Sequence, residues 1–331
     1  MLRNAKTAAH ARIFYKPRRN PPAQANIVKA SEANKTECDL SLPASRQLSH
    51  SVLNEVLCRT ALSDSGLEGL DYSLNPYKGC AHGCIYCYAP DITHVERAWG
   101  TFVDVKMNIP EVLDDETRRK KRGAVGLGTV TDPYQSLEEK YKLTRKCLEI
   151  LAKRKWPVCI QTKSALVLRD VDLLKGMDCE VGFTITAIDD FVRASFEPGA
   201  SSLQERLRAL KELADAGIRT FAFIGPILPH LTDKNGDLER LVAALAEARV
   251  GYVMADMLRI RPGIMECIEP VLRENYPYLL DKWREALAPN GKYFEMTIKR
   301  IGELCEKYGL HFLDRHPFKT VKDLGKQQTL F

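Results

Sequence analysis

Apolar and polar residues follow two different periods between residues 72 and 255, and these periods predict strands and helices in turn. Short apolar runs rich in β-branched and aromatic residues have the length of strands; they cover residues 72–75, 125–130, 157–161, 180–186, 218–224 and 251–255. Stretches with apolar residues at helical spacing lie between them, at 137–153, 166–174, 203–216 and 238–248. Strands that alternate with helices in this way are expected to be parallel and joined by helical crossovers.

Six strand–helix units, rather than eight, favour an α/β fold of the partial (β/α)6 type, a shortened TIM-type barrel. A doubly wound sheet is the competing arrangement, and in both folds ligands bind at the carboxyl ends of the strands. We expect three parts. These are an irregular N-terminal arm over 1–50, the barrel over 51–260 with a short helix near 52–58, and a C-terminal helical extension over 261–331 that packs on the barrel and includes a last strand at 310–313.

The composition is that of an ordinary globular chain. Of the 331 residues, 45% are hydrophobic and 28% are charged, and no apolar run is long enough to cross a membrane. The formal net charge of +6 permits an anionic partner such as nucleic acid but does not require one. The N-terminus is basic and lacks the apolar core of a secretory signal, so we expect a cytoplasmic protein.

Three cysteines lie close together in the segment NPYKGCAHGCIYCYAP, at Cys80, Cys84 and Cys87. This spacing lets three thiolates reach one small cluster from a single loop, and the neighbouring glycines allow the tight turns that such a loop needs. Thiolates suit iron, and three of them leave one iron of a [4Fe–4S] cluster free to bind a further ligand. The alternatives are a zinc knuckle with His82 as the fourth ligand, or a fully ligated cluster with a fourth cysteine such as Cys58.

The pattern C-x3-C-x-aromatic-C, with Tyr86 at the aromatic position, resembles the motif of radical S-adenosylmethionine (SAM) enzymes. Membership of that superfamily implies that the free iron chelates SAM and that one electron, from a donor such as a ferredoxin or flavodoxin, splits the sulfonium. The resulting 5′-deoxyadenosyl radical then abstracts hydrogen from a substrate, for which a nucleic-acid base is one candidate. The competing hypothesis is a non-enzymatic binding module stabilised by zinc or by an iron–sulfur cluster.

Further segments resemble the spore-photolyase-like branch of this superfamily, which implies lyase chemistry. They are GTVTDPYQ at 128–135, QTKS at 161–164, FEPGASSLQERL at 196–207 and PILPHLTD at 226–233. The resemblance implies that Tyr86 and Thr131 contact SAM, that Lys163 pairs with its carboxylate, and that Thr184 lies beside its methionine part. A basic side chain and neighbouring hydroxyls at strand ends have the chemistry for these contacts. Asp132 is expected either to join them as a ligand or to cap the following segment.

Val130 stands where spore photolyases carry a hydrogen-donating cysteine, and it has no S–H group. The resemblance therefore does not extend to the usual thymine-lesion repair cycle. Tyr88 and Tyr134 are candidates for hydrogen relay at the catalytic site, with packing around the cluster as the alternative. Candidates for substrate contacts follow the fifth and sixth strands, where loops carry function, and a basic run is a candidate for phosphate contacts; they are His230, Asp233, Asp256 and Arg259, and the run 118–122.

Overall fold

The computed structural model describes residues 52–234, 236–288 and 292–313. All of them belong to one compact unit, Thr36–Phe331. The arm expected over 1–50 lies outside the described residues, as does the end of the expected C-terminal extension, 314–331. The boundaries expected for the three parts of the chain therefore stay predictions.

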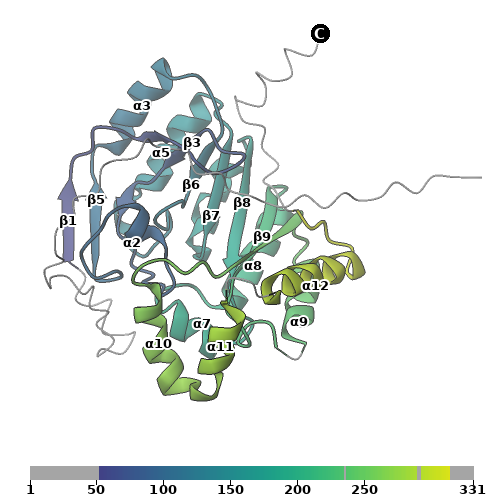
Figure 1. Ribbon diagram of the computed structural model, residues 1–331. Coiled ribbons are helices and arrows are strands. Elements are labelled where there is room, and N and C mark those ends of the chain that lie inside the picture. Colours follow the sequence, from purple (N-terminus) through teal and green to yellow (C-terminus); the bar gives the residue numbers. More distant parts are fainter. Residues whose placement is uncertain (1–51, 235, 289–291, 314–331) are drawn as a thin grey trace, which may run out of the picture. The chain divides into compact units, whose positions relative to one another are not determined.

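The main sheet has seven strands in the order β10-β9-β8-β7-β6-β3-β2 (Figure 1). Neighbouring strands are parallel except for β2 (Leu62–Asp64) and β3 (Tyr72–Leu74), which are antiparallel. The other strands are β6 (Val125–Leu127), β7 (Val158–Thr162), β8 (Cys179–Ile185), β9 (Arg219–Ile227) and β10 (Tyr252–Met257). The predicted parallel strands are thus confirmed. Because they neighbour one another in chain order, without a reversal, they form a partial barrel rather than a doubly wound sheet.

The main sheet separates two apolar cores, because successive side chains of a strand point to opposite faces. Val158 and Ile160 of β7 pack into the large core under the helices, whereas Cys159 between them belongs to a smaller cluster on the inner face. In this smaller cluster the ring of Phe221 stacks on that of Tyr252, with centroids 5.2 Å apart. Both rings lie near the starts of their strands, so they fill the amino-terminal end of the barrel, opposite the carboxyl ends of the strands.

Two of the predicted helices are interrupted. The single helix predicted over 137–153 consists of α4 (Glu138–Tyr141) and α5 (Leu143–Lys153). Lys142 between them has a left-handed backbone with φ +53°, which breaks the helical hydrogen-bond pattern. The stretch 166–174 forms the 3-10 helix η2 (Ala165–Asp170) and then α6 (Val171–Leu174).

The other two predicted helices are confirmed as α8 (Leu203–Asp215) and α9 (Asp237–Glu247). α8 follows α7 (Asp190–Phe196) and begins with a capping box, in which the side chains of Ser202 and Glu205 bind each other's backbone N–H groups. It ends before Gly217, whose φ of +79° suits the residue that follows a helix. These local signals explain why the helix boundaries agree with the sequence pattern.

The short helix predicted near 52–58 is wrong, because residues Val52–Val56 form strand β1. β1 pairs in parallel with β5 (Phe102–Lys106), and β5 pairs in antiparallel fashion with β4 (Tyr77–Lys78), which gives a second, small sheet. A partner strand so far along the chain cannot be seen in local periodicity. The helix α3 (Ile109–Arg119) follows β5. Since β4 leads directly into the cysteine segment, the small sheet anchors it.

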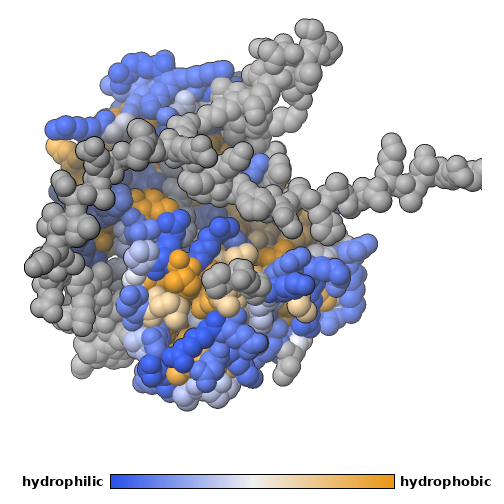
Figure 2. All heavy atoms as spheres, viewed as in Figure 1, coloured by the Kyte–Doolittle hydropathy of each residue, from blue (hydrophilic) through white to orange (hydrophobic). Residues whose placement is uncertain are grey.

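The described part of the C-terminal region forms α10 (Ile264–Asn275), α11 (Leu280–Ala286) and α12 (Tyr293–Lys307). α12 lies along α9, where Lys307 and the Tyr308 hydroxyl both contact Glu239. In place of the strand predicted at 310–313 there is a single bridge between Phe312 and Val253 of β10. Hydrophilic side chains cover the visible sides of α3, α10 and α12, while apolar side chains gather between α10 and α12 (Figure 2). No described helix is long and apolar enough to cross a bilayer.

Candidate functional site

The cysteine loop, residues 79–88, runs from the end of β4 to the start of α2 (Ala89–Ile92). Cys80 and Cys84 are buried and Cys87 is half-buried. Gly79 has φ +89°, and a Cβ atom there would lie 2.4 Å from the carbonyl oxygen of Phe102 in β5. Glycine is therefore needed for the loop to pass so close to β5, and this contact starts the turn that gathers the three thiols.

The cysteine loop is compactly folded around its three thiols. Hydrogen bonds from Gly83 N to Cys80 O (3.2 Å) and from Cys87 N to Cys84 O (3.1 Å) fold the loop into two successive turns. Within the described residues, no three side chains of the types His, Cys, Asp and Glu form a group that could hold one ion. Thiolates that each bind a different iron of a cluster do not have to converge on one point.

Burial raises the pKa of all three thiols, that of Cys80 to about 12. Cysteines in such surroundings stay protonated on their own, because a low dielectric disfavours the thiolate. A bound metal reverses this preference, since its positive charge stabilises thiolate ligands. Without a bound cation, the three thiols are therefore not activated as nucleophiles.

His82, the fourth ligand in the zinc alternative, is buried and faces Asp132, with Nδ1 3.3 Å from Oδ2. Asp132 also accepts hydrogen bonds from the Thr162 hydroxyl (2.7 Å), the Tyr134 N–H (2.9 Å) and the Lys163 N–H (2.8 Å). Burial raises the pKa of Asp132, but His82 and these donors outweigh it and hold the pKa well below its usual value. Asp132 was expected either to be a ligand or to cap the following segment, and its contacts are those of a cap. It caps the turn after β6 and joins it to β7 and to the cysteine loop.

Thr131 contacts the cysteine loop directly. Its hydroxyl donates to the carbonyl oxygen of Gly79 over 2.6 Å and accepts from the side chain of Gln135 over 3.1 Å. The Gln135 side chain in turn accepts a hydrogen bond from the N–H of Ala81 over 2.8 Å. The loop after β6 is thus held against the start of the cysteine loop, and Thr131 lies beside the first cysteine.

Lys163 follows β7 and lies beside the cysteine loop, with Nζ 5.8 Å from the centre of the Tyr86 ring. Burial lowers the pKa of its ammonium group, but the negative charges of Cys84 in its thiolate form and of nearby carboxylates outweigh burial and raise the pKa above its usual value. The group is therefore a cation at neutral pH. On the neighbouring strand β8, Thr184 accepts a hydrogen bond from Gln161 over 2.9 Å. The structure thus places Tyr86 and Lys163 together, and Thr184 on the adjacent strand.

Tyr86 has partners that the sequence analysis missed. Its hydroxyl donates to Glu197 and lies 3.0 Å from the hydroxyl of Thr186. Glu197 forms an ion pair with Arg206 at 2.6 Å. Both charged residues belong to the segment FEPGASSLQERL. The only hint of this ion pair in the sequence was an acid and an arginine nine positions apart in that segment.

The two catalytic candidates differ in their surroundings. Tyr88 is 41% exposed, and its hydroxyl donates to the carbonyl oxygen of Thr129 over 2.5 Å. Tyr134 is fully buried, and its hydroxyl donates to the carboxylate of Asp170 over 3.1 Å. Tyr134 therefore follows the packing alternative, and Tyr88 is the candidate that solvent and a substrate can reach.

The substrate-side candidates lie in the loops after β9 and β10, but their charged groups have protein partners. The N–H of His230 donates to Asp233 over 2.8 Å, and Asp233 also accepts a hydrogen bond from Tyr293 of α12. Asp256 and Arg259 pair with each other through two contacts of 3.1 Å. The loop after β9 is thus tied to the C-terminal helix α12.

The basic run 118–122 lies away from this site. It ends α3 and immediately precedes β6, so it lies at the amino-terminal edge of the sheet, whereas the predicted site residues follow the strands. Arg118 is engaged by Asp114 at 2.5 Å, and the ammonium of Lys120 donates to the carbonyl oxygen of Leu62 over 2.8 Å. The run therefore does not line the candidate site.

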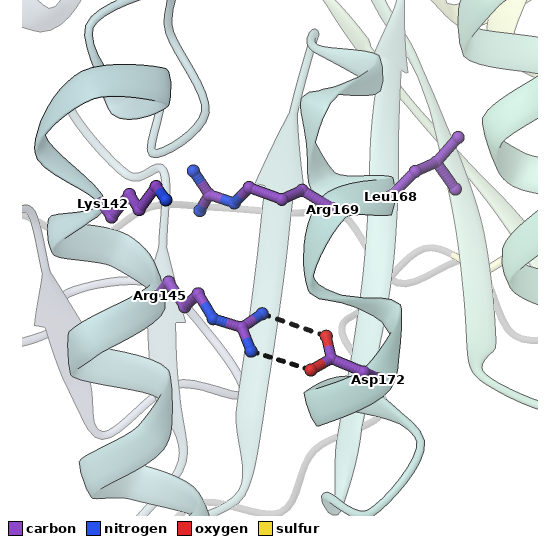
Figure 3. A pocket seen from close by; sticks show the side chains of 5 residues that line it. All are labelled: Lys142, Arg145, Leu168, Arg169 and Asp172. Carbon is purple, nitrogen blue, oxygen red and sulfur yellow. Dashed lines mark hydrogen bonds and ion pairs between the residues drawn. The ribbon is translucent and has the colours of Figure 1, made fainter.

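A separate surface hollow of about 490 Å³ lies between α5 and η2 (Figure 3), lined by Lys142, Arg145, Leu168, Arg169 and Asp172. Arg145 and Asp172 point toward each other across it, with an ion pair of 2.8 Å. Arg169 also pairs with two buried carboxylates, at 2.7 Å each. The charges of Arg145 and Arg169 are thus compensated within the protein, and none of the predicted site residues lines this hollow.

The amino-acid sequence is similar to that of a known enzyme family and of several other proteins. The family model of the radical SAM superfamily matches residues 74–250. An uncharacterised protein of Mycobacterium tuberculosis (strain H37Rv) is 32% identical over 276 residues, which is 78% of this chain and 81% of that protein. An uncharacterised protein of Methanocaldococcus jannaschii is 36% identical over 182 residues, or 54% of this chain and 69% of that protein.

Among solved structures, spore photoproduct lyase in complex with dinucleoside spore photoproduct has a similar fold. The TM-score is 0.59 and the sequence identity is 18%, and the match covers 84% of this chain and 87% of that structure. The partial barrel expected from the strand–helix pattern, and the expected resemblance to the spore-photolyase-like fold, are confirmed. The residues matched by the family model include the cysteine loop and every predicted SAM contact.

Proposed function

Because this chain belongs to the radical SAM superfamily, and is therefore an enzyme, we propose that Cys80, Cys84 and Cys87 bind three irons of a [4Fe–4S] cluster and that SAM occupies the fourth. When bound, the reduced cluster supplies the electron that splits SAM into methionine and a 5′-deoxyadenosyl radical, which abstracts hydrogen from the substrate. A one-electron protein donor such as a ferredoxin or flavodoxin completes the proposal.

The observation that carries the proposal is the juxtaposition of the cysteine loop with the ammonium group of Lys163. That group lies 5.8 Å from the Tyr86 ring, beside the loop. Its positive charge, half-buried at the end of β7, suits the carboxylate of an amino-acid ligand, and a charge-assisted contact there fixes the orientation of the ligand. Three cysteines alone would fit many metal sites, whereas a cation placed beside them fits SAM.

The proposed roles of the other residues follow from their positions. Thr131, in the loop after β6, and Thr184, near the end of β8, supply hydroxyls on either side of β7, where they can bind polar groups of SAM. Tyr86 packs its ring beside the same space. Tyr88 is the candidate for hydrogen transfer, because its side chain is partly exposed whereas that of Tyr134 is fully buried. Val130 offers no S–H group, so we do not propose the thymine-lesion repair cycle.

For the substrate we propose a nucleic-acid base. The likeness of the fold to a lyase solved with a dinucleoside photoproduct supports this class, as does the net charge of +6. A labelled single-stranded oligonucleotide should bind to the reconstituted protein with an affinity that falls as salt is raised, because phosphate contacts release counterions. Absence of binding at low salt would reject the nucleic-acid substrate without affecting the proposed cleavage of SAM.

The cleavage itself is tested by anaerobic reconstitution with iron and sulfide, reduction with dithionite and addition of SAM. We expect 5′-deoxyadenosine and methionine in equal amounts, detected by chromatography. Cys80→Ala should abolish both the cluster and the products, whereas Cys147→Ala, at a buried cysteine of α5, is the matched control that keeps them. An intact cluster that leaves SAM uncleaved would overturn the proposal, and zinc in place of iron would favour the binding-module alternative.

A further inference from the structure

The segment that joins α7 to α8 lies directly against the cysteine loop. The N–H of Ile85 donates to the carbonyl oxygen of Phe196 over 3.1 Å, and the N–H of Gly199 donates to that of His82 over 3.0 Å. A Cβ atom at Gly199 would lie 2.4 Å from the carbonyl oxygen of Ala81. Two backbone contacts and a required glycine thus bring this segment into close packing with the loop that carries the thiols.

A buried side-chain network crosses the same contact. Glu197 accepts hydrogen bonds from the hydroxyls of Tyr86 and Thr186, the latter over 2.7 Å, and pairs with Arg206 at 2.6 Å. The side chains of Glu197 and Arg206 are 0% and 1% exposed. A buried carboxylate is stable only when its charge and its lone pairs are matched in this way. The Tyr86 hydroxyl is therefore one of the groups that complete the network.

Arg206 fixes this carboxylate in turn. Its Nε donates to the carbonyl oxygen of Ser201 over 2.8 Å, and its Nη1 donates to that of Thr184 over 2.8 Å. The guanidinium plane thus binds β8, its own preceding loop and Glu197 at once. A planar group held at three points has little freedom to move, so the carboxylate of Glu197 is held rigidly.

We propose that Glu197, held by Arg206, is a positioning residue that keeps the cysteine loop closed through the hydroxyl of Tyr86. Its side chain is 0% exposed and both of its oxygens bind protein groups, so its proposed action is on Tyr86 and not on the cofactor itself. Its effect passes through the ring of Tyr86, which lies between Cys84 and Cys87 in the chain. The meaning of this role for SAM chemistry rests on the proposed function, but the closing of the loop is a property of the protein without cofactors.

The test measures how often the loop opens in the apo protein. Native apo protein is treated with iodoacetamide under reducing conditions, and mass spectrometry follows the alkylation of each cysteine. Tyr86→Phe keeps the ring and removes only the hydroxyl. Loss of one buried hydrogen bond to a charged group should speed alkylation of Cys84 and Cys87 by about tenfold or more. Cys147 and Cys305, both fully buried elsewhere, report global unfolding in the same sample.

The matched control is Tyr252→Phe. Tyr252 also donates its hydroxyl to a buried carboxylate, that of Glu180, over 2.9 Å, but it lies at the start of β10, at the other end of the barrel. The substitution Tyr252→Phe should leave the alkylation rates of the loop cysteines unchanged. Equal acceleration of all cysteines in Tyr86→Phe, or the same effect in both variants, would show general destabilisation and would overturn the proposal, as would unchanged rates.

A second readout uses the reconstituted protein. Glu197→Gln and Tyr86→Phe should both alter the electron paramagnetic resonance spectrum of the reduced cluster in the presence of SAM, whereas Tyr252→Phe should leave it as in the wild type. Spectra that are identical in all four proteins would contradict the proposed positioning role. A failure of the wild type to cleave SAM would refute the proposed function instead, and it would leave the alkylation result standing.

Discussion

The backbone N–H of Lys163 donates a hydrogen bond to Oδ2 of Asp132 over 2.8 Å. The same oxygen lies 3.3 Å from Nδ1 of His82, inside the cysteine loop. One buried carboxylate thus links the strand end that carries the cation with the loop that carries the thiols. The tertiary structure therefore sets the distance between the Lys163 ammonium and the cysteine thiols, which lie far apart in the sequence.

Replacing Asp132 should therefore disturb SAM binding without removing a ligand of the cluster. Asp132→Asn keeps the size of the side chain but loses the charge that holds His82 and the Lys163 backbone. We expect the Kd for SAM to rise about tenfold, the loss of one charge-assisted hydrogen bond, with iron content unchanged. Anaerobic equilibrium binding measures the Kd. Asp172→Asn, on an exposed aspartate, is the control, and an unaltered Kd in Asp132→Asn would contradict the linking role.

Removing the Lys163 ammonium should weaken SAM binding more directly. Lys163→Met keeps much of the aliphatic chain and removes the cation, so we expect SAM affinity to fall about 10- to 100-fold, as for a lost charge-assisted contact. The cluster should still assemble, as judged by its absorbance and iron content. Lys175→Met changes an exposed lysine in the same way and should have no effect. Equal affinities in both variants would mean that Lys163 does not bind the carboxylate.

Two glycines with left-handed backbones should differ in their tolerance of a methyl group. At Gly79 a Cβ atom would lie 2.4 Å from the Phe102 carbonyl oxygen, whereas at Gly217 nothing lies within 4 Å. Gly217→Ala should lower the free energy of unfolding by about 1 kcal/mol, the cost of the left-handed conformation alone. Gly79→Ala adds overpacking and should lower it by about 3 kcal/mol. Urea unfolding of the apo proteins measures both, and equal losses would refute the close approach to β5.

The stability of the apo protein should depend on pH through Glu197. Burial raises the pKa of this carboxyl, but Arg206 and its other partners outweigh it and lower the pKa from 4.5 to about 2. A carboxyl with a lowered pKa stabilises the folded state above the unfolded pKa, and this contribution is lost as the pH falls from 4.5 towards 2.

At neutral pH the wild type should therefore exceed Glu197→Gln by about 3 kcal/mol in the free energy of unfolding, since each tenfold change in a protonation equilibrium is worth about 1.4 kcal/mol. The difference should shrink below pH 4.5, which urea unfolding at pH 7, 4 and 3 can measure. Glu212→Gln, on the exposed face of α8, is the control. A difference that stays constant with pH would show that the carboxylate charge is not what stabilises the network.

The pattern of the sequence was sufficient for elements that depend on local periodicity. The parallel strands could be predicted because short apolar runs alternate with stretches of helical spacing along the chain. Helix α8 could be predicted because its helical spacing and the glycine that follows it are local signals. Strand β1 could not, because its partner β5 lies far along the chain and only pairing makes Val52–Val56 extended. The break at Lys142 was missed for a similar reason, since that residue type gives no signal for a left-handed backbone.

The amino-acid sequence by itself determined that three thiols come from one loop and that a lysine, two threonines and several acids lie at or just after the ends of strands, because spacing and periodicity are properties of the chain. Only the tertiary structure decided which of these groups meet. It took the Tyr134 hydroxyl into the core beside Asp170, and it brought Glu197 and Arg206 under Tyr86. Such contacts depend on which strands become neighbours, and burial then leaves each polar group only the partners that the fold brings within reach.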